Sequence, residues 1–241
     1  MINLQKIYHS YLLSKSKEHK QKYEKYKGWF SASSAGSCFI KQWLKKEGAE
    51  EKPFDERTMR LLRLGTIVHS DMADSIEHYL GVNASEDVTD NDWFVEHRIE
   101  LPELNVVGHL DVAVHSPSKD TLSVYDIKTA HSFKWKKIFG RNIDPKPSVN
   151  YQLQLGTYGG GLGNELGVSN IDLGLIWYKK DDSLMKLQEI DDIWLDNAYE
   201  YWVELNETLD DDIPNPGDAN SPVYAWECRY CPYQGTECDG I

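Results

Sequence analysis

The four cysteines of this 241-residue chain form one close group and one isolated residue. Cys228, Cys231 and Cys238 fall within eleven residues, and Cys38 lies 190 positions before the first of them. Disulfides are a poor explanation in a large chain that has no secretion signal, whereas thiolates that converge on an irregular loop can bind a metal centre. This spacing is compatible with structural zinc and equally with an iron-sulfur cluster.

A second set of reactive side chains combines two carboxylates, an imidazole and an ammonium. Asp126 and Lys128 share one face of a strand, and an antiparallel neighbour can place Asp111 beside Asp126. Two carboxylates held close resist joint ionisation unless a cation lies between them, and such sites suit Mg2+ or Mn2+. His69 could add an imidazole ligand, which makes Mn2+ easier to accommodate. Ile127 presents its carbonyl along the strand edge.

Hydrophobic periodicity predicts the elements that must position these residues, in the order helix, three strands, helix, strand. Helices are predicted over residues 4–27, 36–47 and 55–80, from about 148, and over 192–209. Strands are predicted over residues 93–101, 106–114, 121–127, 171–178 and 184–190. The pattern indicates an α/β fold in which His69 lies on a helix that precedes the two acidic strands.

Three regions follow from this order. Residues 1–54 form an N-terminal helical region with the first cysteine, residues 55–190 a core, and residues 191–241 a C-terminal helix and the cysteine tail. Residues 213–222 are predicted to be a Pro-containing linker. The glycine run at 159–161 lacks the ending of a phosphate loop and is predicted to terminate a helix. Gly65 is expected to let its helix approach the sheet closely.

Charge is distributed unevenly along the chain. The net charge of −13 argues against a protein that binds nucleic acid through bulk attraction. Residues 1–64, however, carry 14 basic and 7 acidic side chains, so this argument applies only to the acidic remainder of the chain. A basic run follows Asp126, and a solvated surface loop is its simplest interpretation. Its members are Lys128, Lys134, Lys136, Lys137, Arg141 and Lys146.

Membrane insertion is not expected for this sequence. Its apolar runs are far shorter than the roughly 20 residues that a bilayer-spanning helix needs. The first residues lead into a Lys-rich polar stretch rather than a signal sequence. The expected location is therefore the cytoplasm, with no membrane partner.

The combined pattern resembles the PD-(D/E)xK nuclease superfamily, in particular its Cas4 and RecB-like branch with an iron-sulfur cluster. Residues 65–69, 108–111 and 126–128 look like the histidine, first acidic and acidic-lysine motifs of that family. Gln154 and Tyr158, four residues apart on one helix face, look like its fourth motif. The four cysteines are similar to the branch's split cluster ligation, which implies a 4Fe-4S cluster, with zinc less favoured.

The resemblance implies a restriction-endonuclease-like α/β core and hydrolysis of phosphodiester bonds in DNA, often single-stranded and often attacked from an end. The implied metal ligands are His69, Asp111, Asp126 and the carbonyl of Ile127. The implied catalytic residues are Asp111, Asp126, Lys128, Gln154 and Tyr158. Among these, Lys128 would orient or help activate the attacking water, while Gln154 and Tyr158 would position the strand. The basic run would flank the DNA entrance, with Trp135 and Phe139 available for base stacking or for packing.

Two departures from the family pattern and two alternatives accompany this interpretation. Asp126 stands where the branch more often has Glu, and Cys38 is followed by Phe39, Ile40 and Lys41 where relatives often place Pro and Arg. Because no helicase motif is present, unwinding would need a helicase or recombination partner. The alternatives are a noncatalytic DNA-binding or scaffold protein of the same fold, and a zinc-stabilised interaction protein with an acidic tail.

Overall fold

A six-stranded mixed sheet forms the centre of the structure, a computed structural model that describes residues 2–82, 90–144, 148–209 and 227–240. The strands follow the order β1-β3-β4-β5-β6, and β2 pairs with β3. They are β1 (Phe30–Ser31), β2 (Asp92–Leu101), β3 (Val106–Ser116), β4 (Thr121–Ala130), β5 (Ile171–Lys179) and β6 (Met185–Ile190). The expected strands are confirmed with shifts of a few residues at their ends, and β1 was not predicted.

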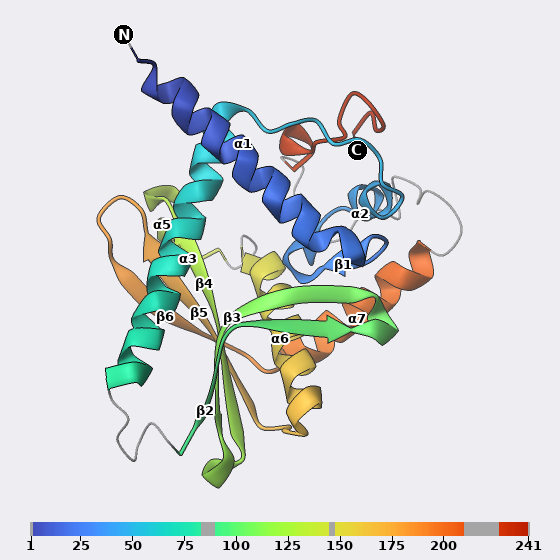
Figure 1. The fold of residues 1–241 in the computed structure, drawn as a ribbon. Coiled ribbons are helices and arrows are strands. Elements are labelled where there is room, and N and C mark those ends of the chain that lie inside the picture. The colour runs from blue at the N-terminus through green and yellow to red at the C-terminus, as the bar shows by residue number, and fades with distance from the viewer. Residues whose placement is uncertain (1, 83–89, 145–147, 210–226, 241) are drawn as a thin grey trace.

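Helices cover both faces of the sheet. They are α1 (Leu4–Tyr23), α2 (Phe39–Lys46), α3 (Glu56–Val82), α5 (Ser132–Phe139), α6 (Val149–Leu166) and α7 (Ile193–Thr208). In Figure 1, α1 crosses α3 on one side of the sheet, while α6 and α7 pack together on the other. Asp55 caps α3 as expected, because its Oδ1 accepts a hydrogen bond from the Thr58 amide at 2.6 Å. None of the helices in the described ranges is both long and apolar enough to cross a bilayer.

The α6 helix corrects the interpretation of the glycine run. The helix continues through residues 159–161 and ends at Gly167, which has φ +70°. A Cβ on Gly159 would lie 2.8 Å from Leu173 Cδ2, and one on Gly161 would lie 2.4 Å from Ile99 Cγ2. These glycines therefore let α6 lie directly against the sheet. Close packing, rather than chain termination, explains their presence.

Gly65 has no comparable role. A Cβ added there would lie 3.7 Å from Thr129 Oγ1, its nearest neighbour, which is an ordinary contact. The expected close approach of α3 at Gly65 is therefore not supported.

The sheet divides between β3 and β4. The two strands are antiparallel, as expected, but their pairing stops at Val112 opposite Tyr125. Beyond that point β3 pairs in parallel with β1, and Figure 1 shows the β2–β3 hairpin turning away from β4. Asp111 and Asp126 are the next residues along the two strands. The fork in the sheet therefore begins at the two predicted acidic residues.

Two hydrophobic clusters hold the described residues together. The large one lies between the sheet and α6, α7 and α5, and includes the fully buried Trp177 and Trp202. The small one joins α2 to the C-terminal tail, and its buried members are Cys38, Ile40, Leu44 and Tyr233. The second cluster lies where the predicted cysteine site would be.

The basic run after Asp126 is partly helical, which corrects its assignment to a solvated loop. Trp135 on α5 is 8% exposed and its ring centroid lies 4.7 Å from that of Phe139. Both side chains pack against the large core, which favours the packing role over base stacking. Lys146 and the predicted linker at 213–222 lie outside the described residues.

Candidate active site

Four of the predicted site residues meet at the fork. His69 reaches down from α3, and its Nδ1 lies 3.1 Å from Asp111 Oδ1 on β3. On β4, Lys128 Nζ lies 2.6 Å from Asp126 Oδ2. Continuing the β3–β4 register places Asp111 opposite Asp126, so both carboxylates belong to one row across the sheet. The fold thus gathers one imidazole, two acids and one amine from three elements.

Ile127 contacts this group through its backbone. Its amide N–H donates a hydrogen bond of 2.6 Å to Asp111 Oδ2, which fixes the second oxygen of that carboxylate. The sequence-derived role of the Ile127 carbonyl as a metal ligand stays a prediction. Asp126 is 1% exposed, and its Oδ2 has the ion-pair contact with Lys128 but no hydrogen bond of normal geometry.

The electrostatics separate the two acids. Burial, opposed by Lys128 and reinforced by the charge of Asp111, raises the pKa of Asp126 to about 7. Burial acts on Asp111 too, but the hydrogen bond and charge of His69 outweigh it and lower the pKa of that carboxyl. Burial also opposes the charged form of His69, yet Asp111 raises the pKa of this imidazole overall. One acid is thus held ionised, whereas the other needs a further cation to ionise fully at neutral pH.

Lys128 is fixed by several neighbours. Besides Asp126, its Nζ donates to Gln154 Oε1 at 2.9 Å, and Gln154 Nε2 donates in turn to the Tyr158 hydroxyl at 2.9 Å. Although burial disfavours the ammonium, the carboxylates of Asp126 and Asp111 raise the pKa of Lys128. Lys128 therefore stays protonated at neutral pH.

Gln154 and Tyr158 are placed for a supporting role. Tyr158 is 2% exposed and Gln154 7% exposed, and both lie on α6 behind Lys128. Burial raises the pKa of Tyr158 well above its ordinary value, so the hydroxyl stays neutral. This geometry favours positioning of Lys128 over the direct contact with a DNA strand that the sequence suggested.

Sequence reasoning missed three residues around the site. Lys128 Nζ lies 4.8 Å from the ring centroid of Tyr151, which is one helical turn before Gln154 on α6. Tyr23, at the end of α1, has its hydroxyl 2.8 Å from His109 Nδ1, two residues from Asp111. The third residue is Glu96 on β2, whose carboxyl interacts with the charges of Asp111 and His69. The three-residue spacing from Tyr151 to Gln154 was a readable signal, whereas Tyr23 joins the site only through tertiary packing.

The donor set suits a divalent cation. Two carboxylates and an imidazole provide the oxygen and nitrogen ligands that Mn2+ accepts, and the raised pKa of Asp126 shows that its charge lacks full compensation. Within the described ranges, no group of three or more His, Cys, Asp or Glu side chains is arranged to hold a metal ion. His69 and Lys128 instead engage the two acids directly. Binding a cation would require these two contacts to open.

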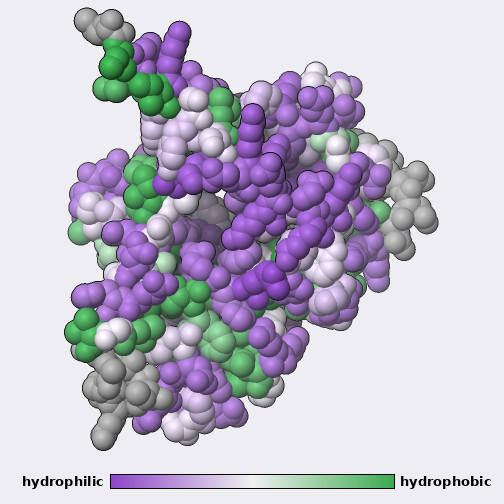
Figure 2. Space-filling model, in the orientation of Figure 1, coloured by the Kyte–Doolittle hydropathy of each residue, from purple (hydrophilic) through white to green (hydrophobic). Residues whose placement is uncertain are grey.

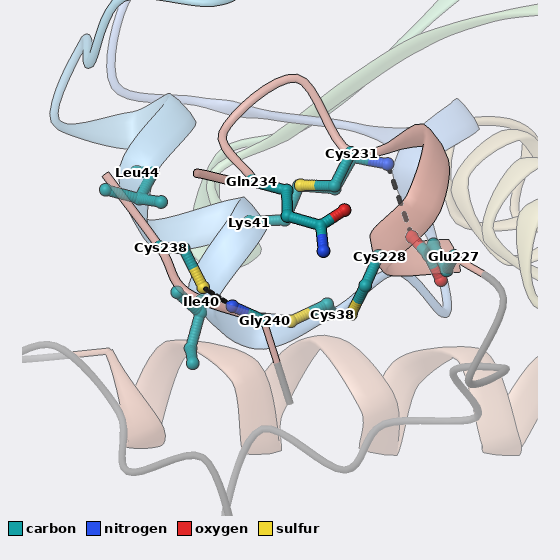
Figure 3. A pocket seen from close by; sticks show the side chains of 10 residues that line it. All are labelled: Cys38, Ile40, Lys41, Leu44, Glu227, Cys228, Cys231, Gln234, Cys238 and Gly240. Carbon is teal, nitrogen blue, oxygen red and sulfur yellow. Dashed lines mark hydrogen bonds and ion pairs between the residues drawn. The ribbon is translucent and has the colours of Figure 1, made fainter. Parts of the chain in front are cut away.

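The four cysteines line one cavity between α2 and the C-terminal tail. Figure 3 shows their side chains around it, with Cys38 from the start of α2 and the other three from the tail. All four are free thiols. Their sulfurs surround a space rather than converge as the ligands of one ion. Burial raises the pKa of Cys38 and Cys231, so a positively charged occupant would be needed to stabilise their thiolates.

Few polar contacts bind the tail to the N-terminal region. Lys41 Nζ lies 3.2 Å from Glu227 Oε1 at the rim of the cavity. The Lys52 amide donates to the Pro232 carbonyl at 3.2 Å, and Lys52 Nζ donates to the Gln234 carbonyl at 2.5 Å. The two ends of the chain are therefore adjacent at the cysteines.

The family model of the PD-(D/E)XK nuclease superfamily matches residues 39–236, which include His69, Asp111, Asp126 and Lys128, and two of the four cysteines, Cys228 and Cys231. The chain belongs to this nuclease superfamily. The resemblance inferred from the motifs is thereby confirmed at the level of the superfamily. No curated protein is significantly similar to the chain in sequence.

Two solved structures share the fold of this superfamily member. The crystal structure of SSO0001 is 15% identical, with a TM-score of 0.53 over 99% of this chain and 100% of that one. A putative exonuclease from Eubacterium rectale is 14% identical, with a TM-score of 0.54 over 93% of this chain and 94% of that one. At these identities the likeness shows the fold alone.

Proposed function

We propose that this superfamily member is a divalent-metal-dependent deoxyribonuclease of the Cas4 and RecB-like branch, acting on single-stranded DNA or on DNA ends. The observation that carries the proposal is the meeting of His69, Asp111, Asp126 and Lys128 at the fork of the sheet. These four side chains come from separate elements, and a purely structural role does not require two acids to lie side by side in one row.

Asp111, Asp126 and His69, with the Ile127 carbonyl, would hold Mg2+ or Mn2+. When bound, the ion would neutralise charge at phosphorus and acidify a bound water. Lys128 cannot serve as a general base while its pKa is raised, because its amine already carries a proton. As an ammonium, it instead donates to the attacking water or to a phosphate oxygen and stabilises the negative charge that develops.

Gln154 and Tyr158 act on the reaction through Lys128. The chain of hydrogen bonds from Tyr158 through Gln154 to Lys128 Nζ holds the ammonium toward Asp126. Tyr151 supports it with its ring face. This arrangement keeps a long, flexible side chain in one position, and such fixed charges stabilise a transition state without reorganising.

We further propose that Cys38, Cys228, Cys231 and Cys238 bind a 4Fe-4S cluster. Support comes from the single cavity that all four side chains line and from their number, because a 4Fe-4S cluster takes four thiolate ligands. The cluster would have a structural role, because binding free energy at such a site becomes folding free energy.

The test of the nuclease is cleavage of end-labelled linear and circular DNA, both single- and double-stranded, by anaerobically purified protein with Mg2+, Mn2+ or a chelator. We expect cleavage of single-stranded or linear DNA with either ion, and none with the chelator. The Asp126→Asn protein serves as the inactive control. A folded protein that leaves all four substrates intact with both ions would contradict the proposal and favour a noncatalytic DNA-binding role.

The cluster is tested separately. Iron and acid-labile sulfide analysis of the anaerobic protein should find both elements, and treatment with a chelator of divalent ions should stop cleavage without removing the brown colour. Stoichiometric zinc without sulfide would contradict the cluster assignment and leave the nuclease assignment unaffected.

A further inference from the structure

The register of β2 and β3 brings Glu96 level with Asp111, although these two residues are not paired in the ladder. The β2–β3 pairing has one constant register, with Val95 opposite Val112 and His97 opposite Leu110. Within β2, the Glu96–Asp111 position is the one place where this ladder is interrupted. Residues directly opposite each other share a face of the sheet. Continuing both registers across their breaks therefore brings Glu96, Asp111 and Asp126 into one row on three adjacent strands.

The backbone at Glu96 is in the left-handed region, with φ +49°. Within the described ranges, the other non-glycine residues with positive φ are Asn105, Asp120 and Ser183, which lie in turns or follow short helices. Glu96 instead lies inside a strand, at the level where β3 leaves β4. Glycine makes such a bend without steric cost, whereas glutamate does not. A strained non-glycine residue beside an active site is a reason to examine what its side chain does.

The carboxylate of Glu96 is close enough to the active site to interact with its charges. Partial desolvation, and then the charge of Asp111, raise the pKa of Glu96, while His69 and Lys22 act in the opposite direction. The structure shows no hydrogen bond or ion pair between the Glu96 side chain and any other described residue. By contrast, Glu100 on the same strand is engaged by Arg98 at 2.9 Å. Glu96 is thus an exposed acid that lies beside the site and has no protein partner there.

We propose that Glu96 supplies a third carboxylate to the divalent-cation site, on the side of Asp111 away from Asp126. This inference rests on the proposed function, since it concerns the same site. The two pairs already formed, His69 with Asp111 and Lys128 with Asp126, leave Glu96 as the acid available to a cation without first breaking a contact. The register of the hairpin, the bend and the lack of a partner all point to the same residue.

The test compares Glu96→Gln with Glu96→Gly and with a control, Glu100→Gln. The control alters an acid four residues further along the same strand. Mn2+ binding to DNA-free protein is measured by calorimetry, and thermal unfolding is followed in parallel. We expect Glu96→Gln to weaken Mn2+ binding by about tenfold or more. Glu100→Gln should bind Mn2+ like the unaltered protein.

Glu96→Gly separates a ligand from a structural residue. Glycine removes both the strained backbone and the repulsion from Asp111, so the unfolding midpoint should stay equal or rise while Mn2+ binding weakens as in Glu96→Gln. Unchanged Mn2+ affinity in both variants, or a lower midpoint with unchanged affinity in Glu96→Gly, would overturn the proposal. If the unaltered protein neither bound Mn2+ nor cut DNA, the proposed function would fail as well. Binding and cleavage by the unaltered protein without any effect at Glu96 would overturn this inference alone.

Discussion

The fork of the sheet and the cysteine cavity are built in opposite ways. At the fork, Asp111 and Asp126 already have protein partners in His69 and Lys128, and the whole group rests on the large core. In the cavity, one buried and three half-buried thiols line a space, and the pKa values of Cys38 and Cys231 are raised. The surrounding hydrophobic cluster has four buried residues. The difference teaches that the first site can keep its shape without a metal ion. If the proposed cluster fills the second site, that site would depend on its occupant for stability.

The largest expected effect is on chemistry at the fork. Asp126→Asn removes a negative charge from the metal site but keeps an oxygen that can accept from Lys128. We expect cleavage to fall by about a hundredfold or more, in line with the loss of a group that acts in the transition state. Circular dichroism and the unfolding midpoint should remain close to those of the unaltered protein. Cleavage at the original rate would remove Asp126 from the mechanism.

The cysteine cavity should respond in the opposite sense. We expect Cys228→Ala to lose the brown colour and to lower the free energy of unfolding by an amount on the order of several kcal/mol, because cluster binding contributes to folding. Absorbance, iron content and thermal unfolding measure the effect. Glu237→Gln, an exposed neighbour of Cys238, is the control and should keep its colour. A stable, brown Cys228→Ala protein would erase the contrast between the two regions.

A pH dependence sharpens the account of the fork. The pKa of Asp126, raised to about 7, means that the metal-free folded protein retains a proton that the unfolded chain has released. That proton stabilises the fold at low pH, and its contribution is lost as the pH rises through about 7. The pKa of His69 is also raised, so this imidazole too holds a proton more tightly in the folded protein. A cation that binds to His69 must displace that proton.

Mn2+ should therefore stabilise the protein more at high pH. Below pH 7, each unit should weaken Mn2+ binding up to about tenfold per displaced proton. The measurement is the Mn2+-induced shift in unfolding midpoint on both sides of pH 7. The shift in Asp126→Asn should depend less on pH, and an equal dependence in both proteins would contradict the assignment.

The smallest expected effect concerns α6, which supports the fork but supplies no residue to the cysteine cavity. A Cβ on Gly160 would meet nothing within 4 Å, so Gly160→Ala should raise the free energy of unfolding by about 0.5–1 kcal/mol through helix propensity. A Cβ on Gly156 would lie 1.9 Å from the Trp194 carbonyl oxygen, so Gly156→Ala should destabilise. Denaturant unfolding of the pair, with cleavage as a second readout, tests whether close packing explains these glycines.

Local patterns predicted the strands and most helix positions, and they singled out residues that the fold brings together at the fork. Alternation of apolar side chains and the two-residue spacing of Asp126 and Lys128 are properties of single elements, so they can be read without the fold. Glu96 could not be found in this way, because its role depends on the register between two strands and on a bend at the fork. The glycines of α6 were misread for the same reason, since their use lies in neighbours such as Ile99 from a distant strand.

The separation of the four cysteines along the chain also sets when their cavity can close. Cys38 emerges from the ribosome 200 positions before Cys238. At about 5–20 residues per second, it waits roughly 10–40 s for its last partner. Cys38 is thus a solitary thiol until Cys228 is made, and closing the cavity brings together residues that are 190 positions apart. Assembly of the cavity consequently cannot precede the synthesis of residue 238, and a translation product truncated before residue 228 would lack three of its four sulfurs.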